Sequence, residues 1–120
     1  MKTVVVLGAT PKSDRYAYLA FKKLLEHGHR PIPVNPAFAE VLGHPCYKSI
    51  ADVGAPIDTV TMYVGAARSA PLLDEIVAAK PRRIIFNPGS ENAKLAAAAE
   101  ADGIEVVHGC TLVMLQMGMF

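Results

Sequence analysis

The stretch Thr3-Val4-Val5-Val6-Leu7-Gly8-Ala9-Thr10 decides the fold class of this chain. An apolar run of this length, rich in β-branched residues and closed by a glycine, predicts a strand buried on both faces. An amphipathic helix follows, with Asp14 as the expected N-cap and Gly28 just beyond the last turn. The apolar stripe of that helix consists of Ala17, Ala20, Phe21, Leu24 and Leu25. A buried strand followed by such a helix is the first half of a βαβ unit.

The same alternation continues along the rest of the chain. Further strands are expected at residues 32–35, 58–64, 83–86 and 105–107, helices at 70–79, 91–101 and 111–117, and a helical turn at 49–53. Pro31 and Pro33 each remove a ladder donor and therefore place the second strand on the outside of the sheet. Ser90 is the expected N-cap of the third helix. The sequence thus predicts an α/β fold, a Rossmann-like doubly wound parallel five-stranded sheet with helices on both faces.

Length and composition limit the class of protein. The chain has 120 residues, 52% of them hydrophobic and 19% charged, which is enough apolar material for one core and predicts a single domain over residues 1–120. A formal charge of +1 argues against a dedicated binder of nucleic acid or of anionic membranes. Two cysteines are too few for a disulfide scaffold, and the apolar runs are shorter than the ~20 residues of a membrane span. We therefore expect a cytoplasmic protein.

Loops that follow the strands form the candidate ligand site, because open parallel sheets bind ligands beyond the carboxyl ends of their strands. The first loop leads into a helix N-terminus, which favours a phosphate group. It contains only Gly8 of the three glycines in a dinucleotide-binding G-x-G-x-x-G, and Asn35-Pro36 stands where an acidic residue would bind a ribose. The motif disfavours a nicotinamide cofactor and leaves another phosphate-bearing nucleotide open.

Several segments, in order and spacing, resemble one known family over nearly the whole chain. They are Val4–Thr10, Arg15-Tyr16, Gly28–Pro36, Leu42-Gly43, Cys46–Ile50, Ile57–Val60, Asn87–Asn92, Gly103–Val107 and Cys110. The family comprises small stand-alone CoA-binding domain proteins, which are related to the N-terminal domain of the succinyl-CoA synthetase alpha subunit.

The resemblance implies a Rossmann-like sheet that holds coenzyme A by its nucleotide and pyrophosphate. It implies ligand contacts at Gly8, Ala9, Thr10 and Ser13, at Val34, Asn35 and Pro36 on the adenosine side, and at Tyr63, Val64 and Gly65 near the pantetheine. Two positions depart from the family pattern. Phe38 stands in the region where the synthetase has a lysine, and Asn87 lies where relatives carry Trp-x-Gln.

For the charged and reactive side chains near these loops, a role in ligand binding has to be weighed against an ordinary structural role. Lys12 and Arg15 are candidate phosphate partners or ordinary solvated charges. His27, His29, His44 and His108 do not follow a metal-binding pattern, so no metal is expected. Cys110 is expected at the N-terminus of the last helix, where a thiolate is stabilised, although an inert buried thiol is the commoner case. A Gly8→Val substitution is expected to abolish ligand binding and to leave the fold largely intact.

Three functions remain open at this level. The leading prediction is a module that binds CoA or acyl-CoA without catalysis of its own. The alternatives are an NAD(P)-binding oxidoreductase-like protein, or a structural or interaction protein with a degenerate nucleotide pocket. The residues do not indicate which acyl group, if any, is bound.

The carboxyl-terminal segment Thr111–Phe120 predicts self-association. It contains no charged side chain, and three of the five methionines lie in its last seven positions. Such a segment has to be covered by its own sheet or by another subunit, and methionine suits an adaptable contact surface. We therefore expect a homodimer with this segment at the interface.

Overall fold

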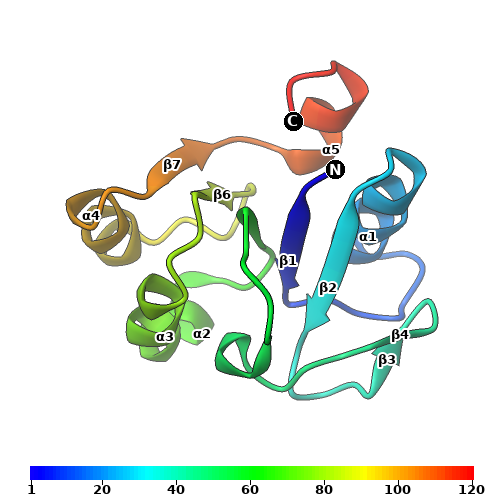
Figure 1. The fold of residues 1–120 in the computed structure, drawn as a ribbon, viewed down its shortest axis with the longest axis horizontal. Helices are drawn as coiled ribbons and strands as arrows, with labels where there is room; N and C mark the ends of the chain where they lie inside the picture. The colour runs from blue at the N-terminus through cyan, green and yellow to red at the C-terminus, as the bar shows by residue number, and fades with distance from the viewer.

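The computed structural model describes all 120 residues, and its centre is one parallel sheet (Figure 1). The sheet consists of β1 (Thr3–Leu7), β2 (Arg30–Val34), β5 (Thr59–Met62), β6 (Arg83–Phe86) and β7 (Glu105–His108). The strand order is β2-β1-β5-β6-β7, and every neighbouring pair is parallel. This confirms the predicted five-stranded doubly wound sheet, with the proline-containing β2 at an edge.

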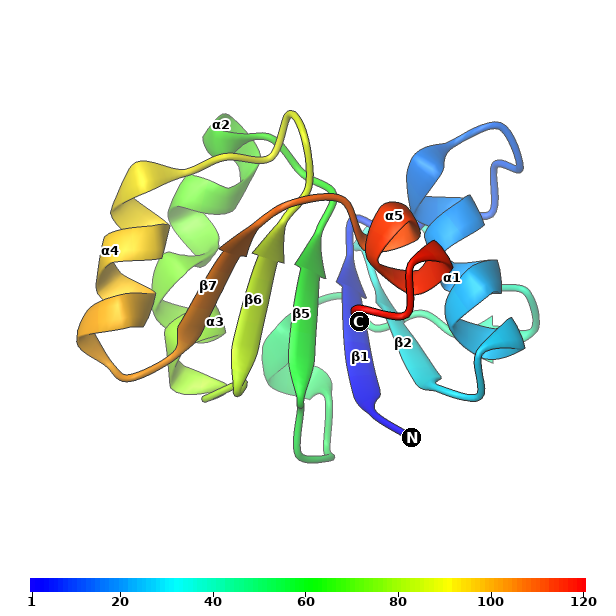
Figure 2. The ribbon, with the colours of Figure 1, turned by 90° about the horizontal axis from the view of Figure 1, so that it is seen from above.

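Helices cover both faces of the sheet. They are α1 (Tyr16–Glu26), α2 (Ala66–Ser69), α3 (Leu73–Ala78), α4 (Ala93–Ala101) and α5 (Thr111–Gln116). Figure 2 shows α1 and α5 side by side on one face, and α3 and α4 on the other. Phe21 of α1 and Leu115 of α5 pack on Val4 and Val6 of β1, while the apolar side chains of α3 and α4 pack on the opposite face. No helix combines the length and the apolar composition that crossing a bilayer requires.

The direction of winding reverses at β1. The chain passes from β1 to β2 on one side and then from β5 outward to β7 on the other. Leu7, the last residue of β1, is in register with Val34 of β2 and with Met62 of β5. The loops after these three strands therefore begin at one level, which is the switch point where doubly wound sheets bind ligands.

Two predicted helix caps are wrong. The N-cap of α1 is Arg15 rather than Asp14, and no side chain caps this helix. The N-cap of α4 is Asn92, whose side chain accepts a hydrogen bond from the Leu95 amide, whereas the Ser90 hydroxyl donates to the Asn87 carbonyl. The helix α1 thus begins two residues after its expected cap and α4 three residues after its own, because the preceding loops use those residues for turns.

The predicted helix at 70–79 begins earlier and is interrupted. The chain is helical from Ala66, passes through a 3₁₀ turn, η2 (Ala70–Leu72), and continues as α3. Pro71 lies in that turn, where its missing amide hydrogen and fixed ring disfavour a continuous α-helix. Of the expected inward residues, Ile76 is fully buried, and Leu73 and Val77 are partly buried against the core. Leu25 of α1 is likewise 36% exposed rather than buried.

A small hairpin between β2 and β5 was not predicted. It pairs β3 (Glu40–Val41) with β4 (His44–Pro45) and is followed by a 3₁₀ turn, η1 (Ile50–Asp52), inside the predicted turn region. The two turn residues, Leu42 and Gly43, both have positive φ, 48° and 79°. Two-residue hairpins of this kind usually carry Asn-Gly or Asp-Gly, so a leucine at the first turn position concealed the signal.

Candidate functional site

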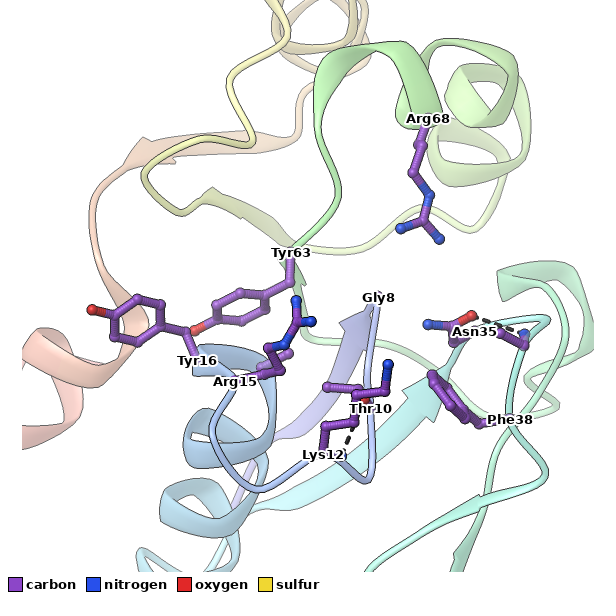
Figure 3. Close-up of a pocket in the computed structure, with 11 residues that line it drawn as sticks. Gly8, Thr10, Lys12, Arg15, Tyr16, Asn35, Phe38, Tyr63 and Arg68 are labelled. Carbon is purple, nitrogen blue, oxygen red and sulfur yellow. Dashed lines mark hydrogen bonds between the residues drawn. The ribbon is translucent and has the colours of Figure 1, made fainter.

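A cavity of about 440 Å³ opens at the carboxyl ends of β1, β2 and β5, and we call it the edge cavity (Figure 3). It is lined by Gly8, Thr10, Lys12, Arg15, Tyr16, Ala17, Asn35, Ala37, Phe38, Tyr63 and Arg68. These residues come from the loop after β1, the start of α1, the loop after β2, the residue that follows β5, and α2. The cavity therefore lies at the switch point of the sheet.

The charged side chains that line the edge cavity are all cationic. Lys12, Arg15 and Arg68 contribute to the lining, and no aspartate or glutamate does. Lys12 and Arg68 form no salt bridge, and Arg15 has only a 3.8 Å contact with the exposed carboxylate of Asp14. Figure 3 shows Arg15 and Lys12 on one side of the cavity and Arg68 across from them. Three cations with this single long contact to a carboxylate make the cavity attractive to an anion.

The N-terminus of α1 adds a second source of positive potential. Tyr16 and Ala17, the first residues of this 11-residue helix, both line the edge cavity. Because no side chain caps the helix, its first amide groups remain available as donors. The positive end of the helix dipole therefore reinforces the three cationic side chains at the same place.

Gly8 allows two strand ends to come into close contact. Its φ is +93°, and a β-carbon at this position would lie 2.8 Å from both the Tyr63 carbonyl oxygen and Cγ1 of Val64. The added atom would thus meet the protein rather than a ligand. The expectation that Gly8→Val spares the fold is wrong, because the side chain would push the loop after β1 away from the end of β5.

Asn35 and Thr10 fix the shape of the loops. The Asn35 side-chain amide donates to the Ala9 carbonyl, and its oxygen accepts from the Ala37 amide, both at 2.9 Å. The Thr10 hydroxyl accepts from the Lys12 amide at 3.2 Å. The bond from Asn35 to Ala9 joins the loop after β1 to the loop after β2, and the bond from Lys12 to Thr10 fixes the turn that carries Lys12.

A second, smaller cavity adjoins the edge cavity beside β2, and we call it the β2 cavity. It has a volume of about 200 Å³ and shares Gly8, Asn35 and Arg68 with the edge cavity. Its other lining residues are Leu7, Val34, Pro36, Lys48, Ser49, Val64, Leu72 and Glu75. The two cavities therefore share part of their lining, and the edge cavity is cationic whereas the β2 cavity is mixed and partly apolar.

Most of the site residues predicted from the sequence meet in these two cavities. Gly8, Thr10, Lys12, Arg15, Asn35 and Tyr63 line the edge cavity, and Val34, Pro36 and Val64 line the β2 cavity. Three predicted residues line neither cavity. Ala9 is fully buried, Ser13 is exposed on the loop, and Gly65 precedes α2.

Sequence analysis missed Arg68 and the contribution of Phe38. Arg68 lies in α2, a helix that was expected to start only after it. The sequence feature that could have indicated Arg68 is its position, three residues beyond the predicted loop residue Gly65. Phe38 was noted as the loss of a lysine, but its side chain lines the cavity, and Arg68 supplies a cation on the facing wall (Figure 3).

Asn87 is a structural anchor beside the site. It is 2% exposed, and its amide nitrogen donates to the Thr61 hydroxyl at 2.7 Å and to the Met62 carbonyl at 2.8 Å. Its oxygen accepts from the Thr111 amide at 2.8 Å. Asn87 therefore ties together the ends of β5 and β6 and the start of α5.

The cysteines and histidines take separate positions. Cys110 is the N-cap of α5, as predicted, and is half-buried. Cys46 lies beside the Asn35 carbonyl, and burial raises the pKa of its thiol. The ring of His108 stacks on Phe86. No three histidine, cysteine, aspartate or glutamate side chains gather in a way that would hold a metal ion.

The sequence is similar to one protein family and to several curated proteins. The profile of a family described as CoA binding domain matches residues 2–116. An ADP-forming acetate–CoA ligase of Methanocaldococcus jannaschii is 33% identical over 63 residues, which cover 52% of this chain and 9% of the ligase. The uncharacterized protein YneT of Bacillus subtilis is 32% identical over 62 residues, 52% of this chain and 46% of YneT. The matched stretch thus spans less than half the length of these curated relatives.

Solved structures share the fold over the whole chain. An uncharacterized protein superposes with a TM-score of 0.95 at 46% identity and covers 100% of this chain and 98% of its own. A hypothetical protein from Pyrococcus horikoshii OT3 has a TM-score of 0.92 at 29% identity, over 97% of this chain and 82% of its own. A dinucleotide-forming acetyl-coenzyme A synthetase of Ca. Korarchaeum cryptofilum has a TM-score of 0.78 at 20% identity, over 90% of this chain and 26% of its own, which shows a shared fold alone.

Proposed function

The chain belongs to the CoA binding domain family, and from this premise we propose that it binds coenzyme A or an acyl-CoA at the carboxyl edge of its sheet. The observation that carries the proposal is the set of cations Lys12, Arg15 and Arg68, which line the edge cavity and have only one contact with a carboxylate of the chain, 3.8 Å between Arg15 and Asp14. Coenzyme A carries a diphosphate and a ribose phosphate, so its charge complements this cavity.

Chemistry along the edge suggests how the ligand lies. The diphosphate occupies the edge cavity between the three cations and the first amides of α1. The adenosine lies along the loop after β2, against Val34 and Pro36 in the β2 cavity. The pantetheine then leads away from the phosphates, past the side chain of Tyr63 (Figure 3).

The curated relatives support the ligand class and not the reaction. The ligase of Methanocaldococcus jannaschii acts on CoA according to its name, and this chain matches only a small part of it. The predictions that the present chain binds its ligand without catalysis, and that it is cytoplasmic, stay predictions.

Native mass spectrometry of the freshly purified protein, followed by isothermal titration with CoA, acetyl-CoA, NADPH and ADP, tests the proposal. We expect saturable binding of CoA or acetyl-CoA that is tighter than that of ADP, because ADP lacks the pantetheine and the ribose phosphate. Tighter binding of NADPH would support the oxidoreductase-like alternative instead. Binding of none of the four up to millimolar concentration would contradict the proposal and favour a degenerate pocket.

We also propose that the chain forms a homodimer through its carboxyl-terminal segment. Leu115 is buried against α1, but Val113, Met117 and Met119 are 48%, 65% and 65% exposed. Truncation after Thr111 would remove the buried Leu115, so a double substitution Met117→Glu and Met119→Glu is the better test. Light scattering is expected to give a dimer for the parent and a folded monomer for the variant. A monomeric parent at tens of micromolar would contradict the dimer.

A further inference from the structure

A third cavity adjoins the edge cavity on the side away from β2, and we call it the side cavity. It has a volume of about 270 Å³. Its lining consists of Tyr16, Tyr63, Asn87, Pro88, Cys110 and Leu112. Tyr16 and Tyr63 also line the edge cavity, and Figure 3 shows these two side chains together at the end of the edge cavity opposite Asn35 and Phe38. The side cavity is thus a neighbour of the edge cavity, and Tyr16 and Tyr63 line both.

The side cavity differs in chemistry from the two others. No lysine, arginine, aspartate or glutamate lines it, whereas the edge cavity has three cations and the β2 cavity has Lys48, Arg68 and Glu75. Both amide hydrogens of Asn87 are already donated, to Thr61 and to Met62. The Tyr63 phenol is neutral at pH 7, and its hydroxyl is buried without a hydrogen-bond partner in the chain. The space therefore suits an uncharged and largely apolar group.

The walls of the side cavity are held in position before any ligand arrives. Leu112 lies in α5, and the preceding residue Thr111 is fully buried. The Thr111 amide donates to Asn87, and the hydroxyl groups of Thr111 and Thr61 lie 2.7 Å apart. A pocket fixed in this way loses little conformational entropy when it is filled.

We propose that the side cavity holds the acyl group of a CoA thioester, and that this group is short and uncharged. The inference rests on the proposed function, since phosphates between Lys12, Arg15 and Arg68 and an adenosine at β2 direct the pantetheine past Tyr63 toward this cavity. A carboxylated acyl group such as succinyl is disfavoured, because its free carboxylate would be buried without a cationic partner.

Titration with a series of thioesters tests the inference. Each methylene group that becomes buried raises affinity about fourfold. We therefore expect butyryl-CoA to bind at least about tenfold more tightly than free CoA, and succinyl-CoA to bind no more tightly than free CoA. Equal affinity for CoA and butyryl-CoA, or a preference for succinyl-CoA, would overturn the inference and leave CoA binding intact. Failure of all the thioesters and of CoA would overturn the proposed function as well.

A substitution that fills the side cavity provides a second test. Leu112→Trp is expected to remove the preference for butyryl-CoA and to change the affinity for free CoA by less than about twofold. Leu19→Trp is the control, because Leu19 of α1 is 39% exposed and lines none of the three cavities. This control should keep the full preference. An undiminished preference in folded Leu112→Trp would overturn the inference.

Alkylation of the two cysteines tests the inference in the chain without any substitution. Cys110 lines the side cavity, whereas Cys46 follows β4 and lines none of the three cavities. Saturating butyryl-CoA should slow the reaction of iodoacetamide with Cys110 more than saturating CoA does. The rate at which iodoacetamide reacts with Cys46 should be nearly the same with either ligand. Equal protection of Cys110 by both ligands would overturn the inference.

Discussion

The two edges of the sheet use arginine in opposite ways. At the amino edge Arg82 donates to the Asp58 carboxylate at 3.0 Å and to Glu105 at 3.4 Å, so its charge is neutralised within the fold. At the carboxyl edge Arg68 and Arg15 surround a cavity, and the closest carboxylate contact is the 3.8 Å one between Arg15 and Asp14. The first edge satisfies its cations with its own residues, and the second leaves them available for a ligand.

Arg83 strengthens this contrast. It is 95% buried, on the strand next to the ion pair, and its Nε donates to the Thr59 hydroxyl at 3.1 Å. Its guanidinium lies 4.5 Å from the centre of the Phe120 ring, and the Lys2 ammonium lies 5.2 Å from the same centre. Cations at the amino edge therefore contribute to packing of the chain, which is a role that no cation at the carboxyl edge has.

The largest effect is expected from breaking the carboxyl edge at Gly8. Gly8→Val should destabilise the fold by about 3–5 kcal/mol, because positive φ and the 2.8 Å contacts with Tyr63 and Val64 act together. Urea unfolding measures the change.

Gly89→Val is the matched control for this substitution. Gly89 has a φ of +92°, against +93° for Gly8, and a β-carbon there would meet nothing within 4 Å. It should therefore cost at least about 2 kcal/mol less than Gly8→Val. Equal destabilisation by both substitutions would show that close contact between the ends of β1 and β5 is unimportant.

The next effect concerns the buried polar anchor at the carboxyl edge. Asn87→Ala should destabilise the fold by about 3 kcal/mol, because it leaves the Thr61 hydroxyl, the Met62 carbonyl and the Thr111 amide without their partner. Thermal unfolding measures it against Ser90→Ala, which removes one bond to the Asn87 carbonyl and should cost about 1 kcal/mol. A loss no larger than that of Ser90→Ala would contradict the anchoring role.

Replacement of the two arginines that line the edge cavity should weaken CoA binding and leave the stability of the fold almost unchanged. The double substitution Arg15→Gln and Arg68→Gln should weaken CoA binding roughly 30-fold, since each charged hydrogen bond to phosphate contributes about one factor of five to ten. The midpoint of thermal unfolding should stay almost unchanged, because neither side chain has a strong partner in the fold. Isothermal titration and a melting curve measure the two quantities.

Lys22→Gln is the control for the loss of charge, because Lys22 lies on the exposed side of α1 and lines neither the edge cavity nor the β2 cavity. It should leave the affinity for CoA within about twofold of the parent. If Lys22→Gln weakened CoA binding as much as Arg15→Gln or Arg68→Gln alone, overall charge, and not the edge cavity, would attract the ligand.

The smallest effect is expected at the amino edge. Burial alone would raise the pKa of Asp58, but hydrogen bonds from Arg82 and Thr59 lower it below its usual value. The charged form thus contributes stability above pH about 4, and this contribution is lost as the pH falls through the lowered pKa. Arg82→Gln should therefore cost less than about 0.5 kcal/mol at pH 7, because the pair is partly exposed.

Unfolding curves at pH 7 and pH 2.5 measure this difference. The gap between the parent and Arg82→Gln should close at the lower pH, and CoA binding at pH 7 should stay unchanged. A variant that binds CoA less tightly would contradict the separation of the two edges.

Much of the fold could be predicted from local patterns. The apolar run Thr3–Leu7 and the exact span Arg83–Phe86 were predicted because buried parallel strands are continuous apolar segments. Pro31 and Pro33 placed β2 at an edge for the same kind of local reason. The helix caps and the hairpin were not predicted because they depend on contacts with residues that are distant in the sequence. Asn92 also donates to the Ser69 hydroxyl, and Val41 of β3 is buried in the core formed with α1.

The candidate site was predicted in part. Loops after β1, β2 and β5 had to meet, given a parallel sheet, and nine of the predicted residues line the two cavities. Arg68 was missed because the four residues of α2 are too few to show a helical apolar stripe, so its distance from Lys12 and Arg15 could not be known. Ala9 was included because the family pattern contains it, but a small side chain in that loop packs inward.

A crystal structure of the chain grown with coenzyme A tests the proposed binding site most directly. We expect the diphosphate to lie in the edge cavity within hydrogen-bonding distance of at least two of the three side chains Lys12, Arg15 and Arg68. The adenosine should lie beside Val34 and Pro36. A ligand bound at the amino edge, near Arg82 or Lys2, or a diphosphate that contacts none of the three cations, would contradict it.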